Sequence, residues 1–580
     1  MRLPLAPLLL LGVSVFPTLS INAEPITITV HADEPVGEPL RPIWNYFGYD
    51  EAGTTLTSEG RHLLGELNEL SDLPIRIRVH HLLTSGDGTL ALKWSSTNAY
   101  TEDENGHPVY DWTMIDAIMD ELTQPGIEPF VQAGFMPQDL SSQPDPYTPQ
   151  LTRRGLPKDM VSGGAFYPPK DYRKWQNLIA AWAQHSVDRY GRERAESWLW
   201  EPWNEPESPY WKGTMEEFFM LYDHFAAGVK SVLPGAKVGG PHVTDPGWKN
   251  GDVFMEAFLE HCRSGLNAAT GEIGAPLDFI AFHAKGTTRL DEQGRVEMNL
   301  RNQLKTIDTY GRIIATFPEF RELPIYIGES DPEGCAGCPA TLDPERDYRR
   351  TSQFAAYTAA AFMRKQDLMT RHGLRLEGAV SWAFTFHDQP WFNGLRALTT
   401  NEIALPVLNA FRLMQPFQHQ QRVRVENAAM ISTDDIMADS VRGRSDVGAV
   451  ATTRAVLLWN YHDVSGEGES VEVKLVFTGV RSSAIDTGWF AMRVDENNAN
   501  AYSRWRAMGE PQNPSPDQVL ALQTASQLQP LEVKFHERNR DERVAKLVLP
   551  PQSVVLVIGQ FLDVPIQVPP PEGKPKPPPN

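Results

Sequence analysis

The sequence predicts an α/β protein, a (β/α)8 barrel followed by a C-terminal β-sandwich. Eight short apolar runs of strand character recur over the first two thirds of the chain, with helical patterns between them. This alternation is typical of a parallel sheet that closes into a barrel. After Arg412 helical periodicity nearly disappears, and short strand-like runs with turn residues replace it. That change predicts a β-sandwich packed on the barrel.

The elements can be assigned in order from their patterns. We expect barrel strands at residues 43–48, 75–79, 129–134, 198–201, 236–240, 279–282, 325–328 and 378–384. Helical patterns lie between them at residues 59–70, 116–122, 172–190, 216–232, 253–262, 300–316 and 348–370. Strand-like runs of the sandwich follow at residues 446–462, 470–480 and 544–558.

The predicted boundaries define three parts after residue 23. Residues 24–417 form the barrel, 418–562 the β-sandwich, and 563–580 a proline-rich tail that is disordered or extended as polyproline. Near the start, residues 25–40 are a candidate strand of the accessory sheet, because apolar and polar side chains alternate there. We expect the accessory domain to support the barrel rather than to bind carbohydrate.

Residues 1–23 have the pattern of a secretory signal peptide. Arg2 precedes an apolar stretch from Leu8 to Phe16, and small residues lead to a cleavage site at Ala23. The stretch is too short to span a membrane, and no later run approaches that length. We therefore expect a secreted or periplasmic protein without a membrane span, and the sequence leaves its oligomeric state open.

The charge balance limits the classes of partner. The 580 residues include 53 basic and 74 acidic side chains, which give a formal net charge of -21, and no basic patch stands out. Nucleic acids and anionic membranes repel such a protein. We therefore expect no nucleic-acid partner.

The stretch 198–206, Trp-Leu-Trp-Glu-Pro-Trp-Asn-Glu-Pro, ends the fourth predicted strand in a rigid turn. Its two prolines interrupt regular backbone, so Glu205 stands at a strand end, a position that suits a catalytic carboxylate. We expect Trp200 and Trp203 to desolvate Glu205 and thereby to raise its pKa toward that of a general acid. An Asn-Glu-Pro turn can also occur without any catalytic role.

A second acid, Glu329, follows the seventh predicted strand and precedes Ser-Asp-Pro. Either Glu205 or Glu329 alone could be a helix cap or a surface group. Together, at the ends of strands four and seven, they face one mouth of the barrel. Paired carboxylates in such a place are the arrangement that glycoside hydrolysis requires.

Further side chains follow barrel strands and are expected in the same pocket. His80 comes after the second strand, His283 and Lys285 after the sixth, and Trp382 lies in the eighth. A lone histidine is more often structural, Trp382 can equally belong to the core, and Lys285 can pair with a neighbouring acid. As a binding residue, the tryptophan would stack on the apolar C–H face of a sugar.

Three cysteines remain to be assigned. Cys335 and Cys338 stand just beyond Glu329, and Cys262 lies in a predicted helix. A zinc site would need two more ligands at suitable spacing, and none accompanies the pair. In an oxidising compartment we expect a disulfide between Cys335 and Cys338, with Cys262 as a buried free thiol. We predict neither a metal nor a cofactor.

The chain resembles glycoside hydrolase family 39, which includes β-xylosidases and α-L-iduronidases. The resemblance rests on the Trp-Asn-Glu-Pro turn and the Gly-Glu-Ser-Asp-Pro strand end, and it extends to residues 78–80, 134–137, 282–286, 406–409 and 500–502. It implies that Glu205 is the acid/base, that Glu329 is the nucleophile, and that Asn204 hydrogen-bonds the 2-hydroxyl of the sugar. His81 departs from the pattern, because xylosidase relatives usually carry glycine there.

The resemblance implies a retaining exo-glycosidase that releases terminal, equatorially linked sugars from an oligo- or polysaccharide. A β-xylosidase-like activity is the expectation. The alternative within the family is an α-L-iduronidase-like enzyme, because iduronidase relatives use a lysine that matches Lys285 near the uronate carboxylate. An arabinosidase, β-glucosidase or β-galactosidase is also open. The alternative from another class, a non-catalytic carbohydrate-binding protein, does not explain why both carboxylates are present.

Overall fold

The computed structural model describes residues 24–86, 96–147, 163–382, 387–479, 488–539 and 542–559. The predicted signal peptide, the proline-rich tail and the last two residues of the expected eighth strand lie outside these ranges. Among the described residues, no helix combines the length and the apolar character that a membrane crossing needs.

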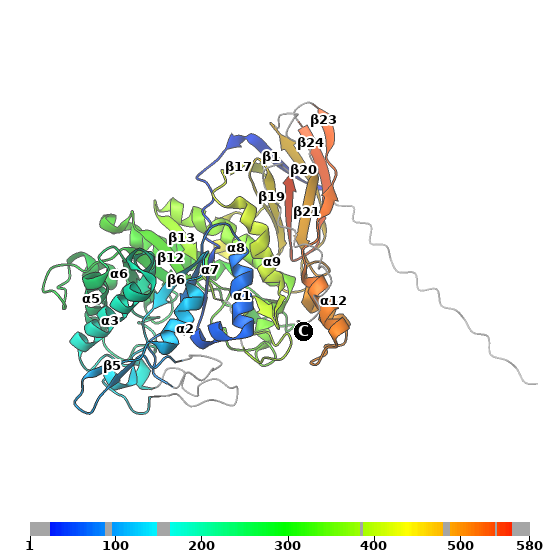
Figure 1. Ribbon diagram of the computed structural model, residues 1–580. Coiled ribbons are helices and arrows are strands. Elements are labelled where there is room, and N and C mark those ends of the chain that lie inside the picture. The colour runs from blue at the N-terminus through cyan, green and yellow to red at the C-terminus, as the bar shows by residue number, and fades with distance from the viewer. Residues whose placement is uncertain are drawn as a thin grey trace, which may run out of the picture.

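A parallel sheet closes into the predicted barrel (Figure 1). In hydrogen-bonded order its strands are β13 (Arg375–Ala379), β12 (Pro324–Glu329), β9 (Phe279–His283), β8 (Lys237–Val243), β7 (Leu199–Glu201), β6 (Ile127–Gln132), β3 (Ile75–Val79), β2 (Tyr46–Tyr49) and β14 (Ser381–Trp382). Only Val380 separates β13 from β14, and β13 pairs with β12 whereas β14 pairs with β2. The two segments are halves of one interrupted eighth strand that closes the ring, and the (β/α)8 barrel is confirmed.

The first barrel strand begins later than the pattern predicted. Residues 43–45 form a turn, in which the Asn45 N–H donates to the Pro42 carbonyl over 3.0 Å. Ile43 and Trp44 are nevertheless buried, so their apolar character reports burial in a turn and not extended backbone. Apolar runs alone do not separate these two cases.

Helices surround the barrel (Figure 1), and their apolar side chains belong to its hydrophobic core. They are α1 (Ser58–Asn68), α2 (Thr113–Leu122), α3 (Tyr172–Tyr190), α4 (Arg192–Glu196), α5 (Met215–Val232), α6 (Gly251–Ser264), α7 (Leu300–Ala315), α8 (Ser352–Arg371) and α9 (Pro406–Met414). Local signals set their starts: Thr214 and Glu217 form a capping box that satisfies free N–H groups at the beginning of α5.

A second, mostly antiparallel sheet packs beside the barrel. Its ten strands run in the order β22 (Leu531–Val533), β21 (Trp489–Val494), β25 (Ser553–Gly559), β19 (Ala455–Tyr461), β18 (Asp446–Ala451), β17 (Val423–Glu426), β1 (Ile26–Pro35), β20 (Val471–Thr478), β24 (Glu542–Leu549) and β23 (His536–Asn539). The strands enclose a hydrophobic core of their own. The predicted sandwich is therefore built from one continuous sheet.

The N-terminal strand β1 joins this second sheet, where the blue segment of Figure 1 lies among strands from the end of the chain. It pairs antiparallel with β17 and parallel with β20, as its alternating pattern suggested. The expectation that helices nearly disappear in this region was only partly right. The second part of the chain also holds α10 (Thr433–Asp439), α11 (Ala501–Ala507) and α12 (Pro516–Ser526).

Helix α8 joins the two parts of the fold, and it is buried over almost its whole length. Arg364 on α8 donates over 2.8 Å to Asp446 of β18, and the Trp459 indole donates to the same carboxylate over 2.7 Å. Both members of the ion pair are buried. The apolar contacts of α8 thus face the barrel on one side and the second sheet on the other.

Candidate active site

Glu205 lies four residues beyond the end of β7, in a turn that regular secondary structure cannot continue. Pro202 and Pro206 lack N–H groups, and Glu205 itself has a left-handed backbone with a φ of 49°. The Glu205 N–H donates to the His242 carbonyl at the end of β8 over 3.1 Å. A non-glycine residue in this conformation is energetically unfavourable, and such residues concentrate at functional sites.

Glu329 is the last residue of β12, and its carbonyl accepts from the Ala284 N–H over 2.9 Å. Both carboxylates are buried, with 6% of Glu205 and 4% of Glu329 exposed. One carboxylate oxygen of Glu205, one ring nitrogen of His283 and one carboxylate oxygen of Glu329 all lie within 4.8 Å of one another. The facing carboxylate oxygens are therefore no more than 4.8 Å apart.

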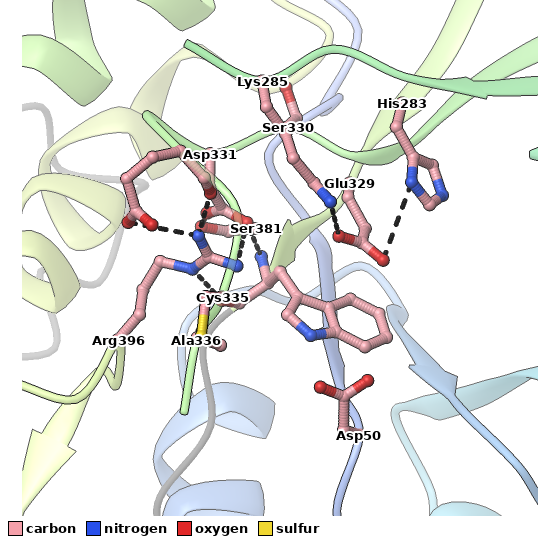
Figure 2. A network of polar contacts seen from close by, with 12 residues as sticks. Asp50, His283, Lys285, Glu329, Ser330, Asp331, Cys335, Ala336, Ser381 and Arg396 are labelled. Carbon is pink, nitrogen blue, oxygen red and sulfur yellow. Dashed lines mark hydrogen bonds and ion pairs between the residues drawn. The ribbon is translucent and has the colours of Figure 1, made fainter. Parts of the chain in front are cut away.

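Two cationic or potentially cationic side chains lie between the carboxylates. The Lys285 ammonium is 3.0 Å from Glu205 Oε1 and 2.6 Å from Glu329 Oε2. His283 Nδ1 lies 2.9 Å from Glu205 Oε1 and 3.7 Å from Glu329 Oε1. Figure 2 shows His283, at the end of the neighbouring strand β9, and Lys285, just beyond it, pointing toward Glu329.

These neighbours reverse the expected pKa of Glu205. Burial raises the pKa of Glu205, but the Lys285 ammonium and the hydrogen bond from His283 outweigh burial and hold it below its ordinary value. Burial likewise opposes ionisation of Glu329, yet Lys285 and then His283 bring its pKa far below the ordinary value. The free site therefore holds both carboxylates ionised.

The rings of Trp200 and Trp203, near Glu205 in the sequence, pack on other aromatic side chains. Trp200 packs against Trp182, with ring centroids 5.1 Å apart, on the helix side of β7. Trp203 packs against Phe135 at 5.0 Å. The prediction of a raised pKa was wrong because it counted apolar neighbours in the sequence and could not include a lysine 80 positions away.

Arg78, at the fourth position of β3, organises the base of the site and is fully buried. It donates to Glu201 over 2.8 Å, to the Asn204 side-chain oxygen over 3.1 Å and to the Gly328 carbonyl over 3.2 Å. It also lies 3.6 Å from Glu329. Burial raises the pKa of Glu201 to about 8, even with Arg78 beside it. The one sequence signal for this role is an arginine inside a barrel strand.

A cavity of about 370 Å³ opens above the carboxylates. Of the residues predicted for catalysis or substrate binding, it is lined by Asn204, Glu205, Lys285, Glu329 and Trp382. Lining residues that the sequence analysis did not assign include Asp50, His81, Tyr210, Asp245, Trp248 and Arg396.

Neither His80 nor His283 forms part of this lining among the described residues. The ring of His80 packs on Trp382, with centroids 4.2 Å apart, and its Nδ1 lies 2.9 Å from Asp50. His81 lines the cavity instead; its backbone is left-handed, with a φ of 59°, and its ring stacks on Phe135 with centroids 4.1 Å apart. The residue that departs from the family pattern thus occupies the cavity wall.

Two buried clusters have ligand types that suit a cation, Asp50 with His80 and His81, and Glu205 with His283 and Glu329. In the second cluster the Lys285 ammonium already supplies the positive charge.

The predicted cysteine pair lies at the same cavity. The sulfurs of Cys335 and Cys338 are bonded, and Cys262 is a buried free thiol. Cys335 belongs to the cavity lining. The buried Arg349 donates to the Cys338 carbonyl over 2.7 Å and to the Cys335 carbonyl over 3.0 Å, which holds this loop in place.

A (β/α)8 barrel with two buried carboxylates at the C-terminal ends of its strands defines the class of glycoside hydrolases. The model of glycosyl hydrolases family 39 matches residues 26–534 of the chain. The chain belongs to this family, as the sequence motifs indicated, and it is a glycoside hydrolase.

Relatives within the family differ in their named activities. A β-xylosidase of Caldicellulosiruptor saccharolyticus is 26% identical over 464 residues, which cover 78% of this chain and 84% of that protein. An α-L-iduronidase of Mus musculus is 24% identical over 589 residues, which cover 95% of this chain and 83% of that protein. A monomeric β-xylosidase of Caulobacter crescentus has a similar fold, with a TM-score of 0.66, 21% identity and coverage of 92% and 99%.

Proposed function

We propose that the protein is a retaining exo-glycosidase in which Glu329 is the nucleophile and Glu205 the acid/base. The observation that carries this proposal is the separation of the facing carboxylate oxygens, no more than 4.8 Å. Retaining enzymes hold their carboxyl groups about 5–5.5 Å apart, whereas inverting enzymes leave about 6.5–9.5 Å for a water molecule. The short separation favours direct attack by a carboxylate.

In the first step a Glu329 oxygen bonds to the anomeric carbon, the glycosidic bond breaks, and the leaving oxygen receives the proton of Glu205. In the second step Glu205 takes a proton from water, which attacks the anomeric carbon and releases Glu329. Asn204 is oriented by Arg78 over 3.1 Å, and we assign it to the sugar 2-hydroxyl. The low pKa of Glu329 suits a nucleophile that must be ionised.

We propose a neutral terminal sugar, with a β-xyloside as the preferred substrate. The Lys285 ammonium is engaged by both carboxylates, at 3.0 and 2.6 Å. Arg396 is engaged as well, because it donates to the Trp382 carbonyl over 2.6 Å and lies 3.5 Å from Asp331 and 3.3 Å from Glu333. In the free site both cations are therefore already paired with groups of the protein itself. Trp382 supplies an apolar ring for the sugar face.

A terminal uronide is the second candidate. It is favoured by the presence of two basic side chains, Lys285 and Arg396, among the residues that line one cavity. The family also includes relatives named α-L-iduronidase. Two cations near the glycone are a suitable environment for a carboxylate.

A panel of nitrophenyl glycosides tests the choice of sugar. Hydrolysis of the β-xyloside, with little or no hydrolysis of the iduronide, is the expected result, and the converse would replace the first candidate by the second. Glu329→Ala tests the mechanism, because loss of the nucleophile should abolish turnover and added azide should restore it with the inverted glycosyl azide as product. A protein that binds these sugars but hydrolyses none of the panel would contradict an enzymatic role.

We also propose that the protein is exported to the periplasm or the medium. The N-terminal pattern of residues 1–23 and the disulfide between Cys335 and Cys338 support export. N-terminal sequencing of the protein from a fractionated expressing cell tests this proposal, with a new terminus after Ala23 as the expected result.

A further inference from the structure

Trp248 lies at the cavity mouth with its indole half exposed. The residue is 46% exposed, and no other tryptophan among the described residues is exposed to a comparable extent. Trp248 lines the cavity. Among the described residues, no aromatic ring contacts its indole and no group accepts a hydrogen bond from its indole N–H. An exposed aromatic ring beside a polar cavity suits the binding of a ligand with an apolar face.

The backbone fixes Trp248 at this position. Residues Asp245 to Trp248, Asp-Pro-Gly-Trp, form a tight turn in which the Trp248 N–H donates to the Asp245 carbonyl over 2.9 Å. Lys249 and Asn250 then have left-handed backbones, with φ of 53° and 61°, and lead into α6. Two consecutive non-glycine residues in this conformation are unusual. The turn is therefore a defined structure and not a loose connection.

The ring lies on the side of the cavity that carries Glu205. The loop after β7 supplies Glu205 and Tyr210, and the loop after β8 supplies Asp245 and Trp248. A hydrogen bond from the Glu205 N–H to the His242 carbonyl connects the first loop to the end of β8. Three other lining residues come from the opposite part of the ring of strands: Asp50 follows β2, His81 follows β3, and Trp382 ends β14. A general acid protonates the leaving oxygen. The leaving group must therefore depart past Glu205, toward the side that holds Trp248.

Asp245, in the same turn, adds a polar group to the cavity lining. One oxygen of its carboxylate accepts hydrogen bonds from the backbone N–H of Lys285 and from the Thr306 hydroxyl, both over 3.2 Å. The other accepts no hydrogen bond from the described residues, so it can accept one from a sugar hydroxyl. Burial raises the pKa of Asp245 to about 6, so it is mostly ionised at neutral pH. An anionic leaving group would be repelled there.

We propose that Trp248 and Asp245 form a binding site for the leaving group, a neutral pyranose that stacks on the indole ring and donates a hydroxyl to Asp245. This site deepens the proposed function and rests on it, because it requires Glu205 to be the acid. The cavity of about 370 Å³ accommodates more than the reacting sugar alone.

The test compares two substrates that share the terminal sugar accepted by the wild-type enzyme. One is the glycosyl fluoride, whose leaving group is too small to reach Trp248, and the other is a neutral β-linked disaccharide. Trp248→Ala should lower kcat/KM for the disaccharide by about tenfold or more and change that for the fluoride by less than about twofold. Trp248→Tyr keeps a ring and should recover much of the loss. Val253→Ala, at an exposed position on α6 outside the cavity lining, is the matched control.

Equal losses on both substrates, or no loss on the disaccharide, would overturn the leaving-group site while the retaining mechanism stands. A disaccharide with an anionic reducing unit that is cleaved as well as the neutral one would overturn the role of Asp245. If the wild-type enzyme cleaves no glycoside, the proposed function fails first, and the leaving-group site fails with it.

Discussion

Replacement of Lys285 by methionine tests the electrostatics of the catalytic pair. The ammonium lies 3.0 Å from Glu205 and 2.6 Å from Glu329, in the space between the two carboxylates. The anomeric carbon of a substrate must occupy the same space when Glu329 attacks it. Substrate binding therefore requires the ammonium to move, and the move removes the charge that holds the pKa of Glu205 low. The acid can then carry its proton.

The size of the effect follows from the carboxylate separation. Without the ammonium, two unit charges up to 4.8 Å apart repel by on the order of 3 kcal/mol at an effective dielectric constant of about 20. The pair then resists double ionisation and titrates together. Both pKa values rise, so both limbs of the bell-shaped profile of kcat/KM move to higher pH.

The assay is the pH dependence of kcat/KM and of kcat on a neutral nitrophenyl glycoside. The profile of kcat/KM reports the free enzyme and should move to higher pH in Lys285→Met. The profile of kcat reports the enzyme–substrate complex, in which the ammonium has already been displaced, so it should move much less. Lys230→Met is the matched control, because Lys230 pairs with Asp278 over 2.8 Å outside the site. An unchanged kcat/KM profile, or an equal shift in the control, would refute this reasoning.

The same variant separates the two candidate sugars. A neutral glycoside has no carboxylate that Lys285 could pair with, so Lys285→Met should spare much of its kcat/KM at the new pH optimum. A uronide would be left with an unpaired buried carboxylate, which costs about 3–5 kcal/mol and so at least about a hundredfold in kcat/KM.

Three further outcomes are expected. Glu205→Ala should slow nitrophenyl glycosides severely but spare dinitrophenyl glycosides, which need little protonation; equal losses on both would contradict the acid role. Mass spectrometry of the unreduced protein should find Cys335 and Cys338 linked, and alkylation of both would rule the disulfide out. Arg364→Met should lower the free energy of unfolding by about 3–5 kcal/mol, because it leaves the buried carboxylate of Asp446 unpaired. In denaturant titrations the exposed control Arg371→Met should cost less than about 1 kcal/mol.

The sequence alone determined the barrel and the two acids. Strand and helix patterns are local, and a residue that follows a parallel strand must reach the C-terminal rim whatever its neighbours are. For this reason Glu205 and Glu329 could be assigned to one mouth from counting alone. The pairing of β1 with the second sheet was also indicated by its alternating pattern.

Tertiary structure decided the chemistry around these acids. His81 lines the cavity and His80 does not, and no sequence pattern distinguished these neighbouring histidines. The ionisation of Glu205 depends on Lys285, 80 positions away, because electrostatic energy follows distance in space and not along the chain. Arg78 joins β3 to β7 and β12 for the same reason. Local propensity places a side chain on an element, but only the packed fold determines which charges share a buried site.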